Sequence, residues 1–211
     1  MHTLFSVKND TVQTIVTRLT ANDPTLEVVK CGQLSLDSAL SKEIFNALKY
    51  STHVKKLEFL GNNSKGAIKF LAESIKTHQS LEEIYLGTNG LDDEEFFYLF
   101  DSLKENLSSV QLLDINCNEG ITDVSAHHIA ELITKYTPIK KMDISSTSIT
   151  DEGLQEILNT LEQNPESSLL ELCEPDILNL GYLAQNEELT QKLSAYFSTK
   201  QNSDSASMKI I

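Results

Sequence analysis

Apolar and polar positions alternate most clearly over residues 81–106. Apolar residues stand at positions 1, 4 and 6 of this stretch and a polar residue at position 9: Leu81, Ile84, Leu86 and Asn89. The spacing predicts a short strand, because alternate side chains of a strand point to opposite faces. Asn89 should bond backbone groups of the following turn that no strand partner reaches. A helix should come next, since apolar residues recur at three- and four-residue steps from Phe96 to Leu103.

This strand, turn and helix pattern recurs along the chain at intervals of about 27 to 29 residues. Repeats begin near residues 26, 54, 81, 110, 139 and 167, and position 4 is apolar in each: Val29, Leu57, Ile84, Leu113, Met142 and Leu170. The spacing is that of the leucine-rich repeat, L-x-x-L-x-L-x-x-N-x-L. The expected fold class is therefore α/β, a leucine-rich-repeat solenoid. We expect a short right-handed horseshoe arc with parallel strands on its concave face and helices on its convex face.

A single leucine-rich-repeat domain is expected over residues 1–197. Residues 10–21 should form a capping helix that covers the open end of the first repeat, and Pro24 should prevent its continuation. After the sixth repeat the pattern decays, and residues 175–197 are interpreted as a C-terminal cap that ends in an amphipathic helix. Residues 198–211 are mostly small and polar, so we expect them to be disordered.

The charge of the chain restricts its partners. The formal net charge is −14, and Arg18 is the only arginine. Nucleic acids and anionic membranes are unfavourable partners, because their binding normally requires a basic face. No apolar run approaches the roughly 18 residues of a membrane span, and the first ten residues lack the pattern of a secretory signal. We therefore expect a cytoplasmic monomer that binds a protein partner, and a basic partner is compatible with the charge.

The cysteines support a reducing environment. The chain has three, and they fall in different repeats: Cys31, Cys117 and Cys173. Strands of a sheet lie about 4.8 Å apart, which should hold these residues too far from one another to form a disulfide. We expect reduced thiols.

Three groups of polar residues have the composition of chemical sites. Residues 92–95 carry four consecutive carboxylates, which would suit a cation but better fit a helix start, where negative charge meets free backbone N–H groups. His127 and His128 are adjacent on an expected helix and point about 100° apart, so they cannot both face one metal. Asp114 and Asp143 resemble a general acid and base, but an open sheet offers no closed pocket. We expect no enzyme activity, metal or cofactor.

Outward side chains of the expected strands should form columns on the concave face, where solenoids commonly bind partners. The central column holds carboxylates from several repeats and one tyrosine, and the pattern places Glu171 beside Asp143 in it. Exposed leucines flank this column, and apolar anchors inside a charged rim are typical of protein interfaces. A binding site on another face and a purely structural chain are the alternatives. The candidate partner-binding residues are Lys56, Glu58, Leu60, Glu83, Tyr85, Leu112, Asp114, Lys141, Asp143 and Glu171.

Residues 10–144 resemble the leucine-rich domain of the tropomodulin and leiomodin family. The matching stretches are TIVTRLTANDPTLEVV, ALKYSTHVKKLEF and FLAESIKTHQSLEEIYL, and the most specific matches are the Asn22-Asp23-Pro24 turn and the segment 53–56. Tropomodulins cap actin filaments at the pointed end. The resemblance therefore implies an alternative function as a regulator of actin filaments or the cytoskeleton. The repeats also look like the ribonuclease-inhibitor-like subclass of leucine-rich repeats.

A looser resemblance concerns the C-terminal segment. Glu187 and Glu188, followed by a polar tail that ends in Ile210 and Ile211, are similar to the translocation signals of effectors that intracellular bacteria inject through type IV secretion. This resemblance implies secretion into the cytosol of a host cell.

The function expected from the residues is that of a non-enzymatic protein-interaction module, which binds its partner through the concave strand face. Regulation of a small GTPase is a further alternative. The absence of any arginine other than Arg18 counts against direct assistance of GTP hydrolysis, because an arginine finger commonly stabilises that transition state.

Overall fold

The computed structural model describes residues 2–105, 109–134, 138–169, 171–173 and 187–207. In the part of the chain that is described, no helix combines the length and apolar character that a bilayer span requires.

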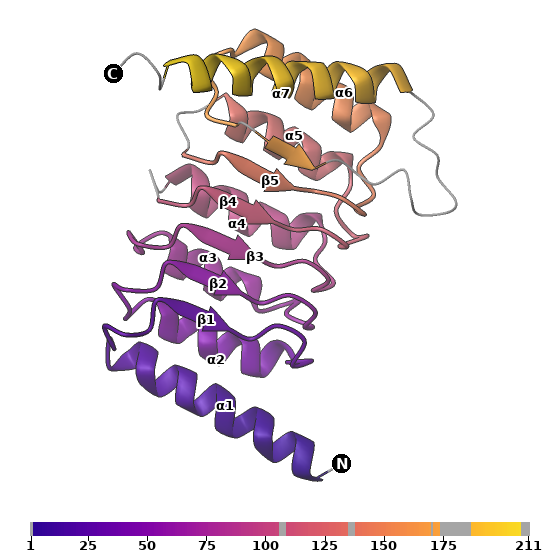
Figure 1. The fold of residues 1–211 in the computed structure, drawn as a ribbon. Helices are drawn as coiled ribbons and strands as arrows, with labels where there is room; N and C mark the ends of the chain where they lie inside the picture. Colours follow the sequence, from indigo (N-terminus) through magenta and orange to yellow (C-terminus); the bar gives the residue numbers. More distant parts are fainter. Residues whose placement is uncertain (1, 106–108, 135–137, 170, 174–186, 208–211) are drawn as a thin grey trace.

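A single parallel sheet forms one face of the molecule, which we call the strand face (Figure 1). The strands lie side by side in the order of the chain. The middle residue of each strand is buried, from Val29 in the first to Leu172 in the last. Within the described residues, the six strands are β1 (Val28–Lys30), β2 (Lys56–Glu58), β3 (Glu83–Tyr85), β4 (Leu112–Asp114), β5 (Lys141–Asp143) and β6 (Glu171–Cys173).

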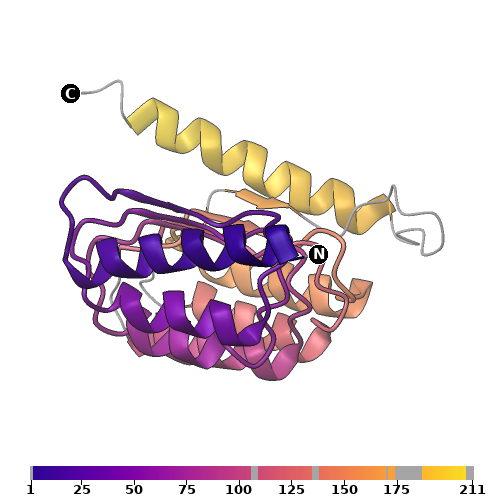
Figure 2. The same cartoon turned by 90° about the horizontal axis from the view of Figure 1, so that it is seen from below.

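In the part of the chain that is described, five helices form a second layer on the other side of the sheet, and we call their outer surface the helix face (Figure 2). Apolar side chains of both layers fill the space between them, and the rings of Phe45 and Phe59 lie with their centroids 4.7 Å apart. This arrangement of strands and helices confirms the predicted solenoid. The five helices are α2 (Ser38–Leu48), α3 (Ile68–Ile75), α4 (Asp93–Glu105), α5 (Asp123–Ile133) and α6 (Asp151–Gln163).

The N-terminal helix α1 (His2–Thr20) lies at the open end of the first repeat and is longer than the predicted residues 10–21. The expected start near residue 10 was wrong. No proline or glycine occurs before the helix ends, so nothing in the sequence interrupts it at Asn9 or Asp10. Val12 and Leu19 of α1 are completely buried against the core.

The C-terminal helix α7 (Glu187–Ser207) closes the other end of the stack (Figure 1). Its buried residues Leu189, Leu193 and Phe197 pack on the last repeat. The prediction of disorder from residue 198 was wrong up to Ser207, because the anchored half of the helix continues into a segment without glycine or proline. The predicted cap residues 175–186 and the end of the proposed secretion signal, residues 208–211, lie outside the described residues.

The pairing of β5 with β6 corrects the sixth repeat. Glu171 lies opposite Lys141 and not beside Asp143. The repeat begins at Leu169, which is 2% exposed and occupies the buried first position, and not near residue 167. A slip of two residues preserves the face to which a strand side chain points, so Glu171 still belongs to the strand face.

An asparagine ladder, Asn62, Asn89 and Asn118, satisfies the turns of the middle repeats. Asn118 shows the pattern most fully. Its Oδ1 accepts hydrogen bonds from the backbone N–H groups of Asn89 and Leu91, both at 3.0 Å. Its Nδ2 donates to the carbonyl oxygens of Leu86 at 3.1 Å and Ile115 at 2.8 Å. Each amide therefore joins its own turn to the turn of the preceding repeat.

Carboxylates at the helix starts connect neighbouring repeats in the helix layer. Asp93 on α4 accepts hydrogen bonds from the backbone N–H of Thr122 at 2.9 Å, from the Thr122 hydroxyl at 2.6 Å and from the Ser125 hydroxyl at 2.5 Å. Asp123 on α5 accepts hydrogen bonds from the backbone N–H of Thr150 at 2.8 Å and from the Thr150 hydroxyl at 2.7 Å. Since Thr122 and Thr150 are the N-caps of α5 and α6, each helix start is completed by the preceding repeat. We call these contacts the Asp–Thr ties.

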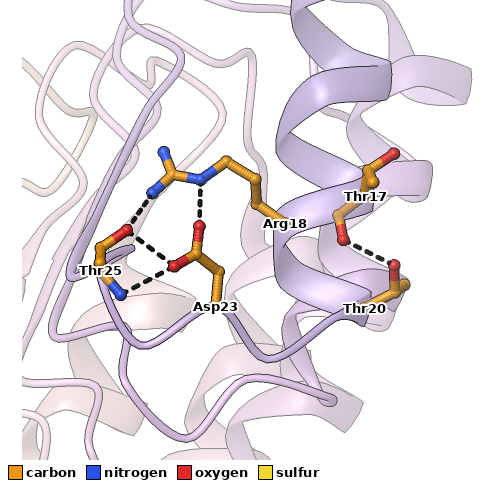
Figure 3. A network of polar contacts seen from close by, with 5 residues as sticks. All are labelled: Thr17, Arg18, Thr20, Asp23 and Thr25. Carbon is orange, nitrogen blue, oxygen red and sulfur yellow. Dashed lines mark hydrogen bonds and ion pairs between the residues drawn. The ribbon is translucent and has the colours of Figure 1, made fainter.

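The only arginine of the chain holds α1 to the first repeat (Figure 3). Arg18 Nε lies 2.6 Å from Asp23 Oδ2, and its guanidinium also donates to the Thr25 hydroxyl at 2.9 Å. Asp23 Oδ1 in turn accepts from the backbone N–H and the hydroxyl of Thr25. Hydrogen bonds from Thr25 and Arg18 lower the pKa of the Asp23 carboxyl to about 2. The resulting turn also includes Asn22, which bonds the backbone N–H of Thr52 at 2.9 Å.

Arg18→Ala is expected to loosen the C-terminal turn of α1 without unfolding the repeats, because the network of Figure 3 is its polar attachment while the apolar core is unchanged. Hydrogen exchange measured by mass spectrometry should accelerate in residues 15–25 and stay constant in α4 and α5. Arg18→Lys retains the charge but not the two-pronged geometry and should give an intermediate rate. Equal exchange in all three proteins would show that the network does not hold the helix.

Candidate functional site

The ten predicted binding residues all lie on the strand face, in two rows set by the pairing register and in Leu60 just beyond β2. The first row consists of Lys56, Glu83, Leu112, Lys141 and Glu171. The second row consists of Glu58, Tyr85, Asp114 and Asp143. The parallel pairing of the strands therefore brings these residues together.

The N-terminal half of the strand face is organised around one lysine. Lys56 Nζ lies 3.2 Å from Glu58 Oε1 and 3.1 Å from Glu83 Oε2. It also lies 4.5 Å from the centroid of the Tyr85 ring, whose hydroxyl donates to Glu83 at 2.9 Å. Although desolvation lowers the pKa of Lys56, hydrogen bonds to the two carboxylates raise it above its usual value. The Lys56 cluster, formed by these four residues, is thus an ion-paired platform with one carboxylate charge in excess, and it presents the Tyr85 ring.

Asp114 and Asp143 differ in exposure. Both carboxylates accept a hydrogen bond from the backbone N–H two residues later in the chain. Asp114 is only 7% exposed, and its Oδ1 accepts from the backbone N–H of Asn116 at 3.0 Å. Burial raises the pKa of the Asp114 carboxyl, and the nearby Asp143 carboxylate acts in the same direction. Asp143 is half-buried and bonds the backbone N–H and the hydroxyl of Ser145 at 3.0 and 2.6 Å. Of the two, Asp143 offers the more accessible carboxylate to a partner.

The two leucines of the predicted site are partly exposed, and Leu60 lies over a glycine. A Cβ atom at Gly87 would lie 2.9 Å from Leu60 Cδ2 and 2.2 Å from Asn116 Oδ1. Because Gly87 has no side chain, the side chains of Leu60 and Asn116 can lie over its backbone. Leu112 lies on the other side of Tyr85, opposite Glu83 in the first row.

The C-terminal half of the strand face contains one further ion pair. Lys141 Nζ lies 2.5 Å from Glu171 Oε1. Their side chains are 40% and 46% exposed, so solvent screens much of this attraction. As in the Lys56 cluster, a lysine of the first row is thus paired with a carboxylate of a neighbouring strand.

The other groups considered as chemical sites are occupied by structural contacts. Asp92 pairs with Lys65 at 2.7 Å, and buried Glu95 accepts the backbone N–H of Gly66 at 2.7 Å. His127 Nδ1 lies 2.7 Å from Glu156 Oε1. Across the described residues, no group of three or more histidine, cysteine or carboxylate side chains is arranged to hold a metal ion.

Exposed apolar residues of the helix face are absent from the sequence-based site. Phe97 on α4 is 45% exposed, and Val124 on α5 is 58% exposed. The ring of His128 lies between α4 and α5, with its centroid 5.3 Å from that of Phe97. The signal was present in the sequence, since Phe97 and Val124 fall outside the apolar stripe of their helices.

Comparisons with known proteins agree with the architecture. No protein-family model matches the chain. It is 28% identical over 135 residues to RAN GTPase-activating protein 2 of Arabidopsis thaliana, a match that covers 63% of this chain and 25% of that protein. It is 33% identical over 116 residues to the ribonuclease inhibitor of Mus musculus, covering 54% of this chain and 25% of that protein. A protein phosphatase 1 regulatory subunit 37 homolog of Caenorhabditis elegans is 26% identical, with 53% and 12% covered.

The chain thus matches a quarter or less of the length of each of these relatives. Among solved structures, the tropomodulin C-terminal domain of Caenorhabditis elegans aligns with a TM-score of 0.54 and 15% identity, over 93% of this chain and 97% of that one. Leiomodin-1 actin-binding site 2 aligns with a TM-score of 0.52 and 14% identity, over 92% of both chains. At such identities the likeness concerns the fold. Repeat spacing, sheet and structural similarities together show that the chain has the fold of a leucine-rich-repeat solenoid.

Proposed function

We propose that this protein is a non-enzymatic binding module that recognises a protein partner through its strand face. The observation that carries the proposal is the position of Tyr85, which is fixed by the Lys56 cluster and shares the strand face with partly exposed Leu60 and Leu112. An aromatic ring with apolar neighbours and a charged surround has the composition of an interface hot spot.

The fixed geometry of Tyr85 favours binding. Its hydroxyl is already bonded to Glu83, and Lys56 already lies against its ring, so little side-chain freedom is lost when a partner covers it. Beyond Tyr85 in the second row, Asp143 presents a partly exposed carboxylate. A partner that places an apolar group on Tyr85 and a basic group near Asp143 would fit both halves of the face. Reduced Cys31 and Cys117 are compatible with such a role in the cytoplasm.

Tyr85→Ala is expected to weaken binding of the partner by about 30-fold, which corresponds to about 2 kcal/mol for a hot-spot side chain. The matched control is Phe97→Ala, which removes an exposed aromatic ring from the helix face. Surface plasmon resonance should measure both variants against Ran, protein phosphatase 1, ribonuclease and actin, the proteins named in the descriptions of the relatives and neighbours. Proteins recovered from a eukaryotic lysate should be quantified with the same two variants.

A partner that is lost with Tyr85→Ala and retained with Phe97→Ala would support the strand face. The opposite pattern, or equal losses with both variants, would contradict it. If actin alone binds, the proposal becomes a tropomodulin-like regulator of actin filaments. If Ran alone binds, GTP hydrolysis should be measured with Arg18→Ala, and we expect no change, because Arg18 is engaged with Asp23 and Thr25.

A further inference from the structure

Charge is segregated along the stack of repeats. Residues 1–80 contain ten lysine or arginine residues and seven aspartate or glutamate residues, whereas residues 81–197 contain five and 23. Because the repeats are stacked in the order of the chain, this division in sequence is also a division in space. The N-terminal end of the solenoid is slightly basic and the C-terminal end is strongly acidic.

The basic charge reaches the helix face through α2 and α3. Lys42 and Lys69 are exposed, and each stands two residues before a buried residue of its helix, so they occupy equivalent positions. Their Nζ atoms lie 4.4 and 5.4 Å from the centroid of the same ring, that of Phe70. Exposed Lys49 follows at the end of α2. Among the described residues, none of these three lysines has an acidic partner within ion-pair distance.

The acidic charge reaches the same face through α4 and α6. Glu94, Glu152 and Glu162 are exposed, and among the described residues they have no basic partner within ion-pair distance. Asp151 and Glu152 also line a shallow, open depression on α6. The helix face therefore carries an excess of lysines at its N-terminal end, beside exposed Glu43, and exposed carboxylates on α4 at its centre and on α6 at its C-terminal end.

The middle of the helix face is apolar. Phe97 occupies on α4, the central helix of α2 to α6, the position that Lys42 and Lys69 occupy on the preceding helices. Val124 lies on the adjacent helix α5, one turn before His128, whose ring centroid is 5.3 Å from that of Phe97. Phe97 and Val124 are two of the three large apolar side chains that are exposed in the described part of the chain.

We propose that a second copy of this chain docks on the helix face as an inverted, back-to-back dimer. A two-fold axis through α4 places α2 and α3 of one protomer against α6 and α5 of its partner, so the basic end meets the acidic end twice and the apolar centres meet each other. Such an interface is isologous and closed. The charge pattern of the face is complementary to itself in this orientation and repels itself in the parallel one. The inference is independent of the strand face, which stays open in the dimer, and it differs from the monomer expected from the sequence.

Sedimentation velocity over a concentration series tests the dimer with the full chain. The mass should rise from 23.5 kDa to twice that value, and added salt should shift the transition to higher concentration. Lys42→Glu/Lys69→Glu makes both ends acidic, and Glu152→Lys/Glu162→Lys makes both ends basic. Each variant alone should dimerise at least about tenfold more weakly, and a one-to-one mixture of the two should form a heterodimer. Circular dichroism confirms that both variants are folded.

The control is Lys30→Glu/Lys140→Glu, which changes the net charge equally at exposed residues away from the helix face and should leave the dimer intact. Phe97→Ala should weaken the dimer by about tenfold. The proposal is overturned by a wild-type mass that stays monomeric at every concentration, or by a mixture that does not associate. A mass that keeps rising beyond two copies would replace the closed dimer with open, head-to-tail association.

Discussion

Replacement of Asn118 by alanine should lower the free energy of unfolding by about 4 kcal/mol, because two buried backbone N–H groups lose their acceptor and each costs about 1–3 kcal/mol when unsatisfied. These are the N–H groups of Asn89 and Leu91, both bonded to Asn118 Oδ1. Ile115 also loses a donor to its carbonyl oxygen. Asn118 is completely buried, so water cannot replace the lost bonds without entering the core. Urea denaturation followed by circular dichroism measures the change.

The chain supplies its own graded controls at the equivalent positions of neighbouring repeats. Asn62 Oδ1 accepts one backbone N–H, that of Leu36 at 2.9 Å, so Asn62→Ala should cost less than Asn118→Ala. Thr147 bonds only the carbonyl oxygen of Ile144, at 2.7 Å, and is partly exposed. Thr147→Ala should therefore cost about 1 kcal/mol. If the three costs do not follow this order, the number of accepted N–H groups does not determine the stability of the ladder.

Acidification from pH 6.5 to 4 should remove about 3 kcal/mol of stability through His78, at about 1.36 kcal/mol for each pKa unit. His78 is 4% exposed, and burial lowers the pKa of its imidazole from 6.5 to about 4. The unfolded chain therefore binds a proton near pH 6.5, whereas the folded chain resists it until about pH 4. Stability is full above the unfolded value and falls as the pH decreases between the two values.

His78→Gln should show a smaller loss of stability on acidification. The stability of each protein at neutral pH is the reference for its own curve. Burial also lowers the pKa of His128, which adds a change of the same sign, so His128→Gln should flatten the curve further. The raised pKa values of Glu95 and Asp114 act in the opposite direction, because the folded protein binds those protons more tightly. Urea denaturation at a series of pH values, with exposed His127→Gln as the control, separates these contributions. Parallel curves for the wild type and His78→Gln would refute the assignment.

The repeats could be predicted from the sequence because their apolar spacing is enforced by burial. Positions 1, 4 and 6 of a repeat enter the core, and each substitution there would be costly, so the pattern persists even where the polar ladder lapses at Thr147. The sixth repeat was misplaced by two residues because Leu170 and Leu172 fit positions 4 and 6 of the predicted register, whereas in the observed register Leu169 and Leu172 occupy positions 1 and 4. The ends of α1 and α7 were misjudged because helices without an interrupting residue extend beyond their packed segments.

The strand face could be predicted only as a set of residues. Strand parity placed all ten on one side, but it could not show that Lys56 bridges two carboxylates or that Asp114 closes a turn and is buried. Those facts depend on side-chain reach between neighbouring repeats. The exposed apolar residues of the helix face were not predicted. The apolar periodicity of a helix identifies its buried side, whereas Phe97 lies on the exposed side.

The Asp–Thr ties define a 30-residue segment that can be deleted as a unit, residues 94–123. This segment does not begin at the strand, where the sequence repeat begins. Deletion of residues 94–123 would join Asp93 directly to Val124, and Asp93 would then stand where Asp123 stands, facing the N-cap Thr150. The new junction would thus inherit a complete helix start. Whole-repeat gain or loss in this frame keeps each cap with a donor and an acceptor, which makes the length of the solenoid adjustable in evolution and in protein engineering.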